Sequence, residues 1–394
     1  MQAADRSKTA LFGWELGANL GHLSAIARLV DRFTSAGFTL VFAVPDVVSA
    51  RLVLPETALV IPAPVWPFSA FAGGRLGYCG YGDLLTQAGF HEPERLTAMA
   101  RAWQALFALT RPDVLIADHA PAALVAARAA GLPVFSIGSP YTTPPPGPGP
   151  LPQYRADIAP ALPDSRHIES AAQTAVALKS AARFTRAADL ISADQSFAIG
   201  ISALDPYAPL RRVALYAPPG GFTPPAPLTG DARLFAYLGA DMDGVESVVQ
   251  GLTLTGVPTE IYLRHANAAL SHFLTRAGIR VHEKPADLRD VFSRVSHVMS
   301  HAGAMLSAEA FHAGKVHLML PRQGEQQLNA RLVEAGGGGR ILLQSGTALE
   351  DSRRLRAAIE DTQLVAKARD AGTLAALRPS EDVGDALVAA LGAL

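Results

Sequence analysis

The sequence predicts an α/β protein built from two doubly wound, Rossmann-like domains, and three observations support this prediction. Its 394 residues, of which 49% are hydrophobic and 18% charged, are enough for about two hydrophobic cores. Short apolar strands alternate with amphipathic helices in both halves, as in parallel sheets. A proline- and glycine-rich stretch at 217–225 separates the halves, as a linker would.

Composition excludes several classes of protein. The formal net charge is −1, so no strongly basic surface for nucleic acid is expected. The sole cysteine, Cys79, excludes an intramolecular disulfide and a cysteine-based zinc site. Residues 1–17 lack the apolar segment of a signal peptide, and no run of about eighteen apolar residues occurs. We therefore expect a cytoplasmic protein without stable membrane insertion. A homodimer is compatible with the sequence.

A histidine that could act as a general base follows the first predicted strand. Residues 9–14 read as a buried strand, a turn with Gly17 and Gly21 follows, and His22 opens a helix over about 23–36. Residues 38–44 give the next strand. Two glycines alone are weak evidence, but His22 lies where side chains of doubly wound folds face a ligand.

The rest of the first half alternates strands with connections. A strand at 114–117 ends in Asp118 and His119, and another is expected at 134–137. The glycine- and aromatic-rich stretch 66–90 and the proline-rich stretch 142–152 are predicted loops. Helix is expected over 165–190. The predicted organisation is a first Rossmann-like domain at 1–217, a linker at 218–230, a second Rossmann-like domain at 231–379 and a C-terminal helix at 380–394.

The second half contains the most informative stretch. Strands are predicted near 233–239, 260–263, 280–282, 295–299 and 316–320, with helices over 244–255, from the turn at 300–303 to about 313, and from 327. His301, Ala302, Gly303 and Ala304 open one of these helices, where backbone N–H groups favour an anion such as a diphosphate. Glu309 follows two turns later. Glu325 and Gln326, with Asn329, offer groups that hydrogen-bond sugar hydroxyls.

These residues also resemble a known pattern. The order His301-x-Gly303, Glu309, Pro321, Glu325-Gln326-x-x-Asn329 and a glycine-rich turn is similar to the nucleotide-sugar signature of GT-B glycosyltransferases. The nearest likeness is to family 1, which includes UDP-glycosyltransferases and antibiotic macrolide glycosyltransferases. The resemblance implies GT-B architecture, with two Rossmann-like domains facing across a cleft and the last helix returning to the first domain. It also implies that the domain at 1–217 binds the acceptor, with the loop at 66–90 facing it, and that the domain at 231–379 binds the nucleotide-sugar donor.

The resemblance also implies roles. His22 would deprotonate an acceptor hydroxyl, with Asp118 on its other ring nitrogen. The turn at His301 to Ala304 would bind the donor diphosphate, with His301 donating to the β-phosphate. Glu309 would bind the ribose, whereas Glu325 and Gln326 would hold the transferred sugar.

Some positions depart from the pattern. Met305 and Leu306 replace small or hydroxyl residues near the phosphate, Ala240 replaces serine or threonine, and Lys315 replaces an aliphatic residue. Asp241-Met242-Asp243 resembles a metal-binding DxD motif of a different fold, and we interpret it as coincidental. No essential metal and no cofactor are expected, because the helix terminus supplies positive charge.

The resulting expectation is an inverting, metal-independent glycosyltransferase that moves a sugar from a UDP- or dTDP-sugar to a small-molecule acceptor, most simply a natural product. Three alternatives remain. One is a transferase for a lipid-linked acceptor, resembling the GlcNAc transferase of peptidoglycan synthesis. Another is a non-catalytic auxiliary protein that binds nucleotide sugars, which Met305 and Leu306 favour. The third is a sugar-nucleotide epimerase.

Overall fold

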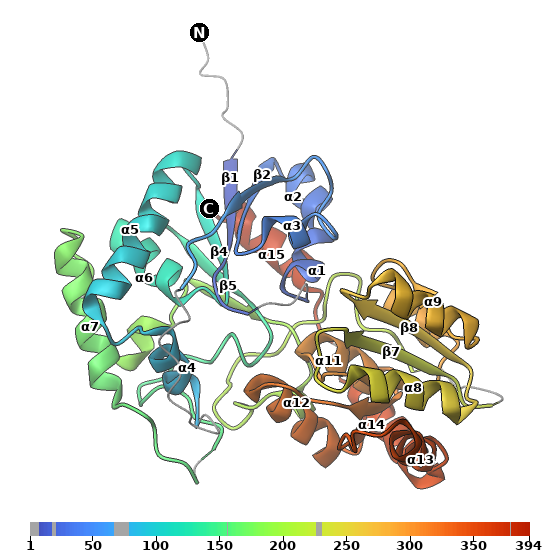
Figure 1. The fold of residues 1–394 in the computed structure, drawn as a ribbon. Coiled ribbons are helices and arrows are strands. Elements are labelled where there is room, and N and C mark those ends of the chain that lie inside the picture. Colours follow the sequence, from blue (N-terminus) through green and yellow to red (C-terminus); the bar gives the residue numbers. More distant parts are fainter. Residues whose placement is uncertain (1–7, 18–20, 67–78, 156, 226–230, 379) are drawn as a thin grey trace. The chain divides into compact units, whose positions relative to one another are not determined.

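A computed structural model describes residues 8–394 apart from 18–20, 67–78, 156, 226–230 and 379 (Figure 1). The chain divides into two compact units. Unit 1 contains Met1–Ile199, Asp205–Gly220 and Glu381–Leu394, and unit 2 contains Gly200–Leu204 and Gly221–Ser380. The division near the middle of the chain falls at Gly220, inside the expected linker, of which 226–230 lie outside the described residues.

Unit 1 is built on a six-stranded sheet in which all neighbouring strands are parallel. Its central strands are apolar and buried over their whole length, because helices cover both faces of such a sheet. In sheet order the strands are β3 (Leu59–Pro62), β2 (Phe38–Val44), β1 (Lys8–Trp14), β4 (Val114–Asp118), β5 (Val134–Gly138) and β6 (Gln195–Ala198).

The helices of unit 1 differ from the prediction in three places. The single helix expected at 23–36 is two, because the Leu29 N–H bonds to Ile26 O (2.9 Å) in a tightened turn. The stretch 66–90, expected as a loop, contains the helix α4. The Asp83 carboxylate stabilises this helix by accepting from the Cys79 N–H (2.8 Å). Residues 67–78 of the stretch lie outside the described part of the chain. Helix ends at Ala177 rather than near 190. The helices are α1 (Gly21–Ala27), α2 (Val30–Ser35), α3 (Val47–Ala50), α4 (Tyr81–Ala88), α5 (Pro93–Thr110), α6 (Pro121–Ala130), α7 (Asp164–Ala177) and α15 (Val383–Gly392).

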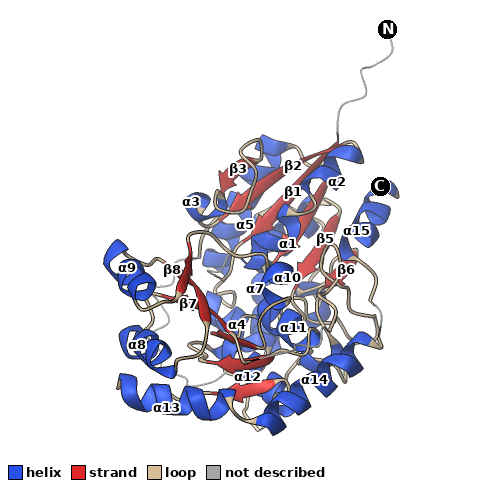
Figure 2. Cartoon of the chain, turned by 90° about the vertical axis from the view of Figure 1, so that its right-hand side faces the viewer, coloured by secondary structure: helices blue, strands red, loops and turns tan. Residues whose placement is uncertain are grey.

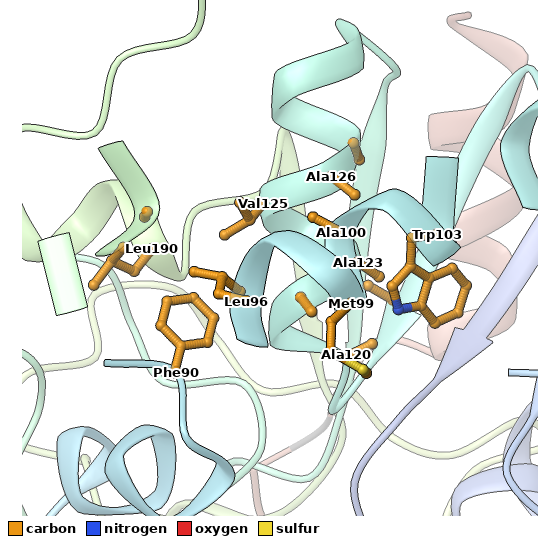
Figure 3. Close-up of a cluster of buried hydrophobic side chains, with 14 of the residues drawn as sticks. Phe90, Leu96, Met99, Ala100, Trp103, Ala120, Ala123, Val125, Ala126 and Leu190 are labelled. Carbon is orange, nitrogen blue, oxygen red and sulfur yellow. The ribbon is translucent and has the colours of Figure 1, made fainter. Parts of the chain in front are cut away.

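The core of unit 1 gathers between α5, α6 and the sheet. Figure 3 shows Trp103 and Leu96 of α5 against the small side chains of α6. Trp103 is fully buried and packs on Gly13 of β1, where a Cβ atom would lie 2.9 Å from the indole ring. Glycine at this point of β1 therefore lets α5 pack closely on the strand that leads into the candidate site.

Unit 2 repeats the architecture with a second six-stranded parallel sheet. Its strands in sheet order are β12 (Gly339–Ile341), β11 (Val316–Met319), β10 (His297–Ser300), β7 (Leu234–Gly239), β8 (Thr259–Arg264) and β9 (Arg280–His282), drawn as red arrows in Figure 2. Its helices are α8 (Val245–Thr255), α9 (Ala268–Arg276), α10 (Leu288–Phe292), α11 (Ala304–His312), α12 (Gly324–Ala335), α13 (Ala348–Ile359) and α14 (Thr362–Ala376).

Both sheets have the strand order 3-2-1-4-5-6 when their strands are numbered within each unit. This order has one switch point, between the first and fourth strands, and ligands of doubly wound proteins bind beyond the carboxyl ends of the strands there. In unit 1 the switch point lies between β1 and β4, and in unit 2 between β7 and β10. The predicted fold class, α/β with two Rossmann-like sheets, is confirmed.

The last described helix belongs to unit 1, although it follows all of unit 2 in the sequence. Ala217 pairs with the strand-like segment before α15 through its N–H to Glu381 O (2.8 Å) and its carbonyl from the Val383 N–H (3.0 Å). Arg32 of α2 forms ion pairs with Asp382 (2.9 Å) and Asp385 (2.8 Å). Among the described residues, no helix has the length and apolar character needed to cross a membrane.

Candidate functional site

The structure brings His22 and Asp118 together at the switch point of unit 1. Trp14, the last residue of β1, lies opposite Asp118, the last residue of β4, and His22 is the second residue of α1. Nδ1 of His22 lies 3.0 Å from Oδ1 of Asp118. Because an ionised carboxylate can only accept, this contact favours a ring that carries its proton on Nδ1 and the basic lone pair on Nε2.

Packing holds this pair in place. The Trp14 ring stacks on His22 with centroids 4.9 Å apart and an angle of 25°. The Asp118 side chain is only 4% exposed, against 17% for His22. Two glycines make room for the pair: a Cβ on Gly17 would lie 2.7 Å from Nε2 of His22, and one on Gly138 would lie 2.9 Å from Oδ1 of Asp118. Both have positive φ, which side chains disfavour.

His119 is a neighbour of His22 for which the sequence predicts no role. Its ring lies 6.0 Å from that of His22 at an angle of 20°, and its backbone φ is +48°. Burial lowers the pKa of His119 to about 3, so the ring is neutral at physiological pH. Within the part of the chain that the structure describes, neither of its ring nitrogens has a hydrogen-bond partner.

Sequence reasoning missed Glu15, which follows Trp14 and is 1% exposed. Its carboxylate accepts from the Trp66 indole N–H (2.8 Å) and from the backbone N–H groups of Ala122 (3.1 Å) and Ala123 (2.5 Å). Burial raises the pKa of Glu15 to about 7, against the lowering effect of these hydrogen bonds. An acidic residue directly after a buried strand was the only signal in the sequence.

In unit 2, His301 lies at the switch point between β7 and β10. Its Nδ1 is 2.9 Å from Leu320 O, and the Gly239 N–H donates to its Nε2 (3.0 Å). Burial is the main cause that lowers the pKa of His301. A neutral ring has one N–H, and here that N–H is given to Leu320. The ring thus joins the ends of β7, β10 and β11, and the predicted donation of His301 to a β-phosphate, which would have to replace the bond to Leu320, stays a prediction.

The turn after His301 prepares the start of α11. Ala302 has a φ of +61°, its N–H donates to Ser300 Oγ (3.1 Å), and its carbonyl accepts from Asn329 Nδ2 (3.0 Å). Gly303 is extended and α11 begins at Ala304. The first N–H groups of a helix have no acceptor within it, so this end offers donors and partial positive charge to an anion. Leu306, one of the departures from the family pattern, is buried in the core.

Glu309 is buried on α11 and already has a partner within unit 2. Its Oε2 accepts from the Thr223 N–H (3.1 Å). Beside it, the His312 ring stacks on Phe222 with centroids 4.9 Å apart, and Nδ1 of His312 lies 2.9 Å from Thr223 O. The start of unit 2 is thereby held against α11. The predicted contact of Glu309 with ribose would have to be made beside the hydrogen bond from Thr223 or would have to replace that bond.

The two residues predicted to hold the sugar lie in the first turn of α12, which begins at Gly324 and not at 327. Gln326 is buried, and its Oε1 accepts from the Arg322 N–H (2.9 Å), which folds the preceding loop onto the helix. Glu325 is half-buried. Asn329, one turn on, makes the bond to Ala302 described above, so the two predicted clusters meet.

Charged groups surround the same edge of the sheet. Arg322 forms an ion pair with Asp241 (3.1 Å) and also donates to the Asp241 carbonyl (3.1 Å). Arg264 ends β8, the strand next to β7. The first aspartate of the DxD sequence is thus paired with an arginine. Gly239 is required here, since a Cβ would lie 2.3 Å from the Asp241 carboxylate.

Part of the second unit matches a known family of protein domains. Residues 286–380, which run from α10 to the end of α14, match the family described as "Glycosyltransferase family 28 C-terminal domain". A search of curated protein sequences finds no match to the chain.

Solved structures match along nearly the whole chain. The glycosyltransferase SnogD from Streptomyces nogalater is 16% identical with a TM-score of 0.62, and the match covers 98% of this chain and 99% of that one. The spinosyn rhamnosyltransferase SpnG is 18% identical with a TM-score of 0.64, covering 98% and 100%. The glycosyltransferase VinC, solved in complex with DTDP, is 15% identical with a TM-score of 0.63, covering 98% and 99%. The chain therefore has the two-domain GT-B fold of these glycosyltransferases, and residues 286–380 of its second unit match the glycosyltransferase family 28 C-terminal domain.

Proposed function

We propose that the protein transfers a sugar from a UDP- or dTDP-sugar to a hydroxyl of a small natural-product acceptor, with inversion at the anomeric carbon and without a metal ion. Unit 1 would bind the acceptor and unit 2 the donor. The observation that carries this proposal is the His22–Asp118 pair at a switch point, because a protein that only binds nucleotide sugars needs no base.

In the proposed reaction, Nε2 of His22 takes the proton of the acceptor hydroxyl. Asp118 keeps the other nitrogen protonated and stabilises the imidazolium that forms. The acceptor oxygen bonds to the anomeric carbon while the bond to the diphosphate breaks, and the electron pair of that bond leaves with the diphosphate. One displacement of this kind inverts the configuration of the anomeric carbon.

The leaving diphosphate would be stabilised by the start of α11. Support comes from the backbone N–H groups at Gly303 and Ala304, which are held by the bonds of Ala302 to Ser300 and Asn329. His301 would act on the diphosphate through the backbone it orders. Glu309 is proposed to bind ribose, and Glu325 and Gln326 the transferred sugar.

The experiment that tests this function measures nucleoside diphosphate release from UDP- and dTDP-sugars with a panel of hydroxylated natural products. His22→Ala should lower kcat/KM by roughly 10²–10⁴-fold, the usual contribution of a general base. Asp118→Asn should also lower it, because the asparagine leaves the ring without a charged acceptor. Nucleotide binding, measured as a rise in melting temperature with UDP or dTDP, should survive both changes.

A matched control is His91→Ala. His91 also belongs to unit 1 and also lies near a carboxylate, 3.9 Å from Glu92, but not at the switch point. Its removal should leave transfer unchanged. Full activity in His22→Ala would contradict the assignment of the base. Nucleotide binding without transfer to any acceptor would favour the auxiliary-protein alternative.

A further inference from the structure

The carboxylate of Glu15 connects the turn after β1, which precedes His22, to the start of α6, which follows Asp118. The strands β1 and β4 pair as far as Trp14 and Asp118, and the segments that follow the two strands then separate into different turns. Glu15 belongs to the segment that leads from β1 to His22. The N–H groups that it accepts from, those of Ala122 and Ala123, belong to the segment that follows Asp118. The carboxylate thus continues a connection that the sheet no longer provides.

The start of α6 is suited to this contact. Pro121 is its first residue and has no N–H, so Ala122 and Ala123 provide the first donors of the helix, and both are used by Glu15. When the carboxyl is ionised, its negative charge also faces the positive end of the helix. The Trp66 indole N–H donates to the same carboxylate, so three N–H groups converge on this one side chain.

A backbone bond runs beside the carboxylate. The Leu16 N–H donates to His119 O (3.1 Å), and the Trp14 indole N–H donates to Leu16 O (2.5 Å). The indole that stacks on His22 is therefore attached to the same turn. Any shift of the turn after β1 relative to α6 would move the ring of His22 against Asp118.

We propose that Glu15 is a positioning residue, which holds the His22–Asp118 pair in its hydrogen-bonded geometry by fastening the turn after β1 to the start of α6. This inference rests on the proposed function, since it assigns Glu15 to the same reaction. Glu15 acts through His22 and touches neither donor nor acceptor in this role.

Glu15→Gln tests the proposal with little change of volume. One oxygen becomes an NH₂ group that faces backbone N–H donors and cannot accept from them, so the turn loses part of its attachment. Because small displacements of reacting groups are costly, kcat should fall by roughly 10- to 100-fold. The KM for the donor and the rise in melting temperature with UDP or dTDP should remain within about twofold of wild type, since unit 2 is untouched.

The decisive comparison repeats Glu15→Gln in a His22→Ala background. If Glu15 works through His22, the substitution should lower kcat only when His22 is present, because residues that act as a unit are non-additive. Asp189→Asn is the matched control. Asp189 is also a buried carboxylate of unit 1 that accepts from two backbone N–H groups, those of Thr185 (2.9 Å) and Arg186 (3.0 Å), but at neither turn of the pair.

A second measurement does not depend on residual activity. The Nδ1–H of His22 should give a downfield proton resonance, assigned by its absence from His22→Ala. This resonance should broaden or disappear in Glu15→Gln and persist in Asp189→Asn. If Glu15→Gln does not fold, Glu15→Asp, which shortens the side chain but keeps its charge, replaces it in both experiments.

Equal losses of kcat with and without His22, or an unchanged resonance in Glu15→Gln, would overturn the proposal and leave Glu15 a purely structural residue. A failure of the proposed function appears elsewhere, in the single variant His22→Ala, as transfer that does not decrease.

Discussion

Lys315 is a buried cation whose removal should stabilise unit 2. It lies just before β11, is 1% exposed and, among the described residues, has no hydrogen-bond partner for its ammonium group. Burial lowers its pKa from 10.5 to about 8. Because lowering a pKa by one costs about 1.4 kcal/mol, this change of about 2.5 corresponds to a penalty of roughly 3.5 kcal/mol in the charged form. Lys315→Met has a similar volume and no charge, so it should recover most of that free energy at pH 7.

The stability penalty of the buried Lys315 should decrease as the pH rises. The folded-state pKa lies below the unfolded one, so the folded protein binds the proton more weakly. Below pH 8 the penalty is fully present, and it disappears as the pH rises from 8 to 10.5. The advantage of Lys315→Met should therefore be constant up to about pH 8 and shrink above it.

Thermal unfolding at several pH values measures this effect. A gain of about 3 kcal/mol should raise the melting temperature of unit 2 by roughly 6–12 °C at pH 7 for a unit of this size. Lys367→Met, on the exposed side of α14, is the control and should change stability by less than about 0.5 kcal/mol. A Lys315→Met protein that is less stable than wild type at pH 7, or an advantage that does not shrink up to pH 10, would refute the reasoning.

Two further substitutions test the close packing of α14 in unit 2 and the attachment of α15 to unit 1. Gly372→Ala should destabilise unit 2 by roughly 1–3 kcal/mol in urea unfolding, because its Cβ would lie 2.6 Å from the backbone of Gly314. Gly392→Ala, with no atom within 4 Å of its Cβ, should do no harm, and equal effects would contradict the packing argument. Asp382→Ala should cost unit 1 about 1 kcal/mol, because Asp382 caps α15 through the N–H groups of Gly384 and Asp385. An equal fall in the melting temperature of unit 2 would count against this assignment.

Much of the architecture was predictable because local patterns determine it. Buried apolar runs mark the strands, and a glycine or a histidine after a strand marks the turns into helices. Since the first and fourth strands of a doubly wound sheet are neighbours, residues that follow them are expected to approach each other. His22 and Asp118 do so. Their selection as the catalytic pair, among many polar residues, nevertheless came from the family resemblance, because the spacing of apolar residues predicts strands and helices but not catalytic roles.

The parts that were not predicted depend on contacts between distant residues. The ring of His301 is occupied by Gly239, 62 residues earlier, and by Leu320, 19 residues later. Glu15 reaches Ala122 and Ala123 over more than one hundred positions. No short window of sequence contains the partners that decide these two cases. The helix α4 is different, because Asp83 stabilises it locally, and it was missed because the glycines and aromatic residues around it obscured its pattern.

The place of α15 affects how the chain folds during synthesis. Figure 1 shows this helix, red in the sequence colouring, among the blue elements of unit 1, and it contacts α2. Residues 221–380 are made before it, which takes on the order of ten seconds at roughly 5–20 residues per second. Throughout that time, Arg32 and the backbone of Ala217 lack the partners they have in the finished protein. The unit that carries His22 and Asp118 starts first on the ribosome and is completed last.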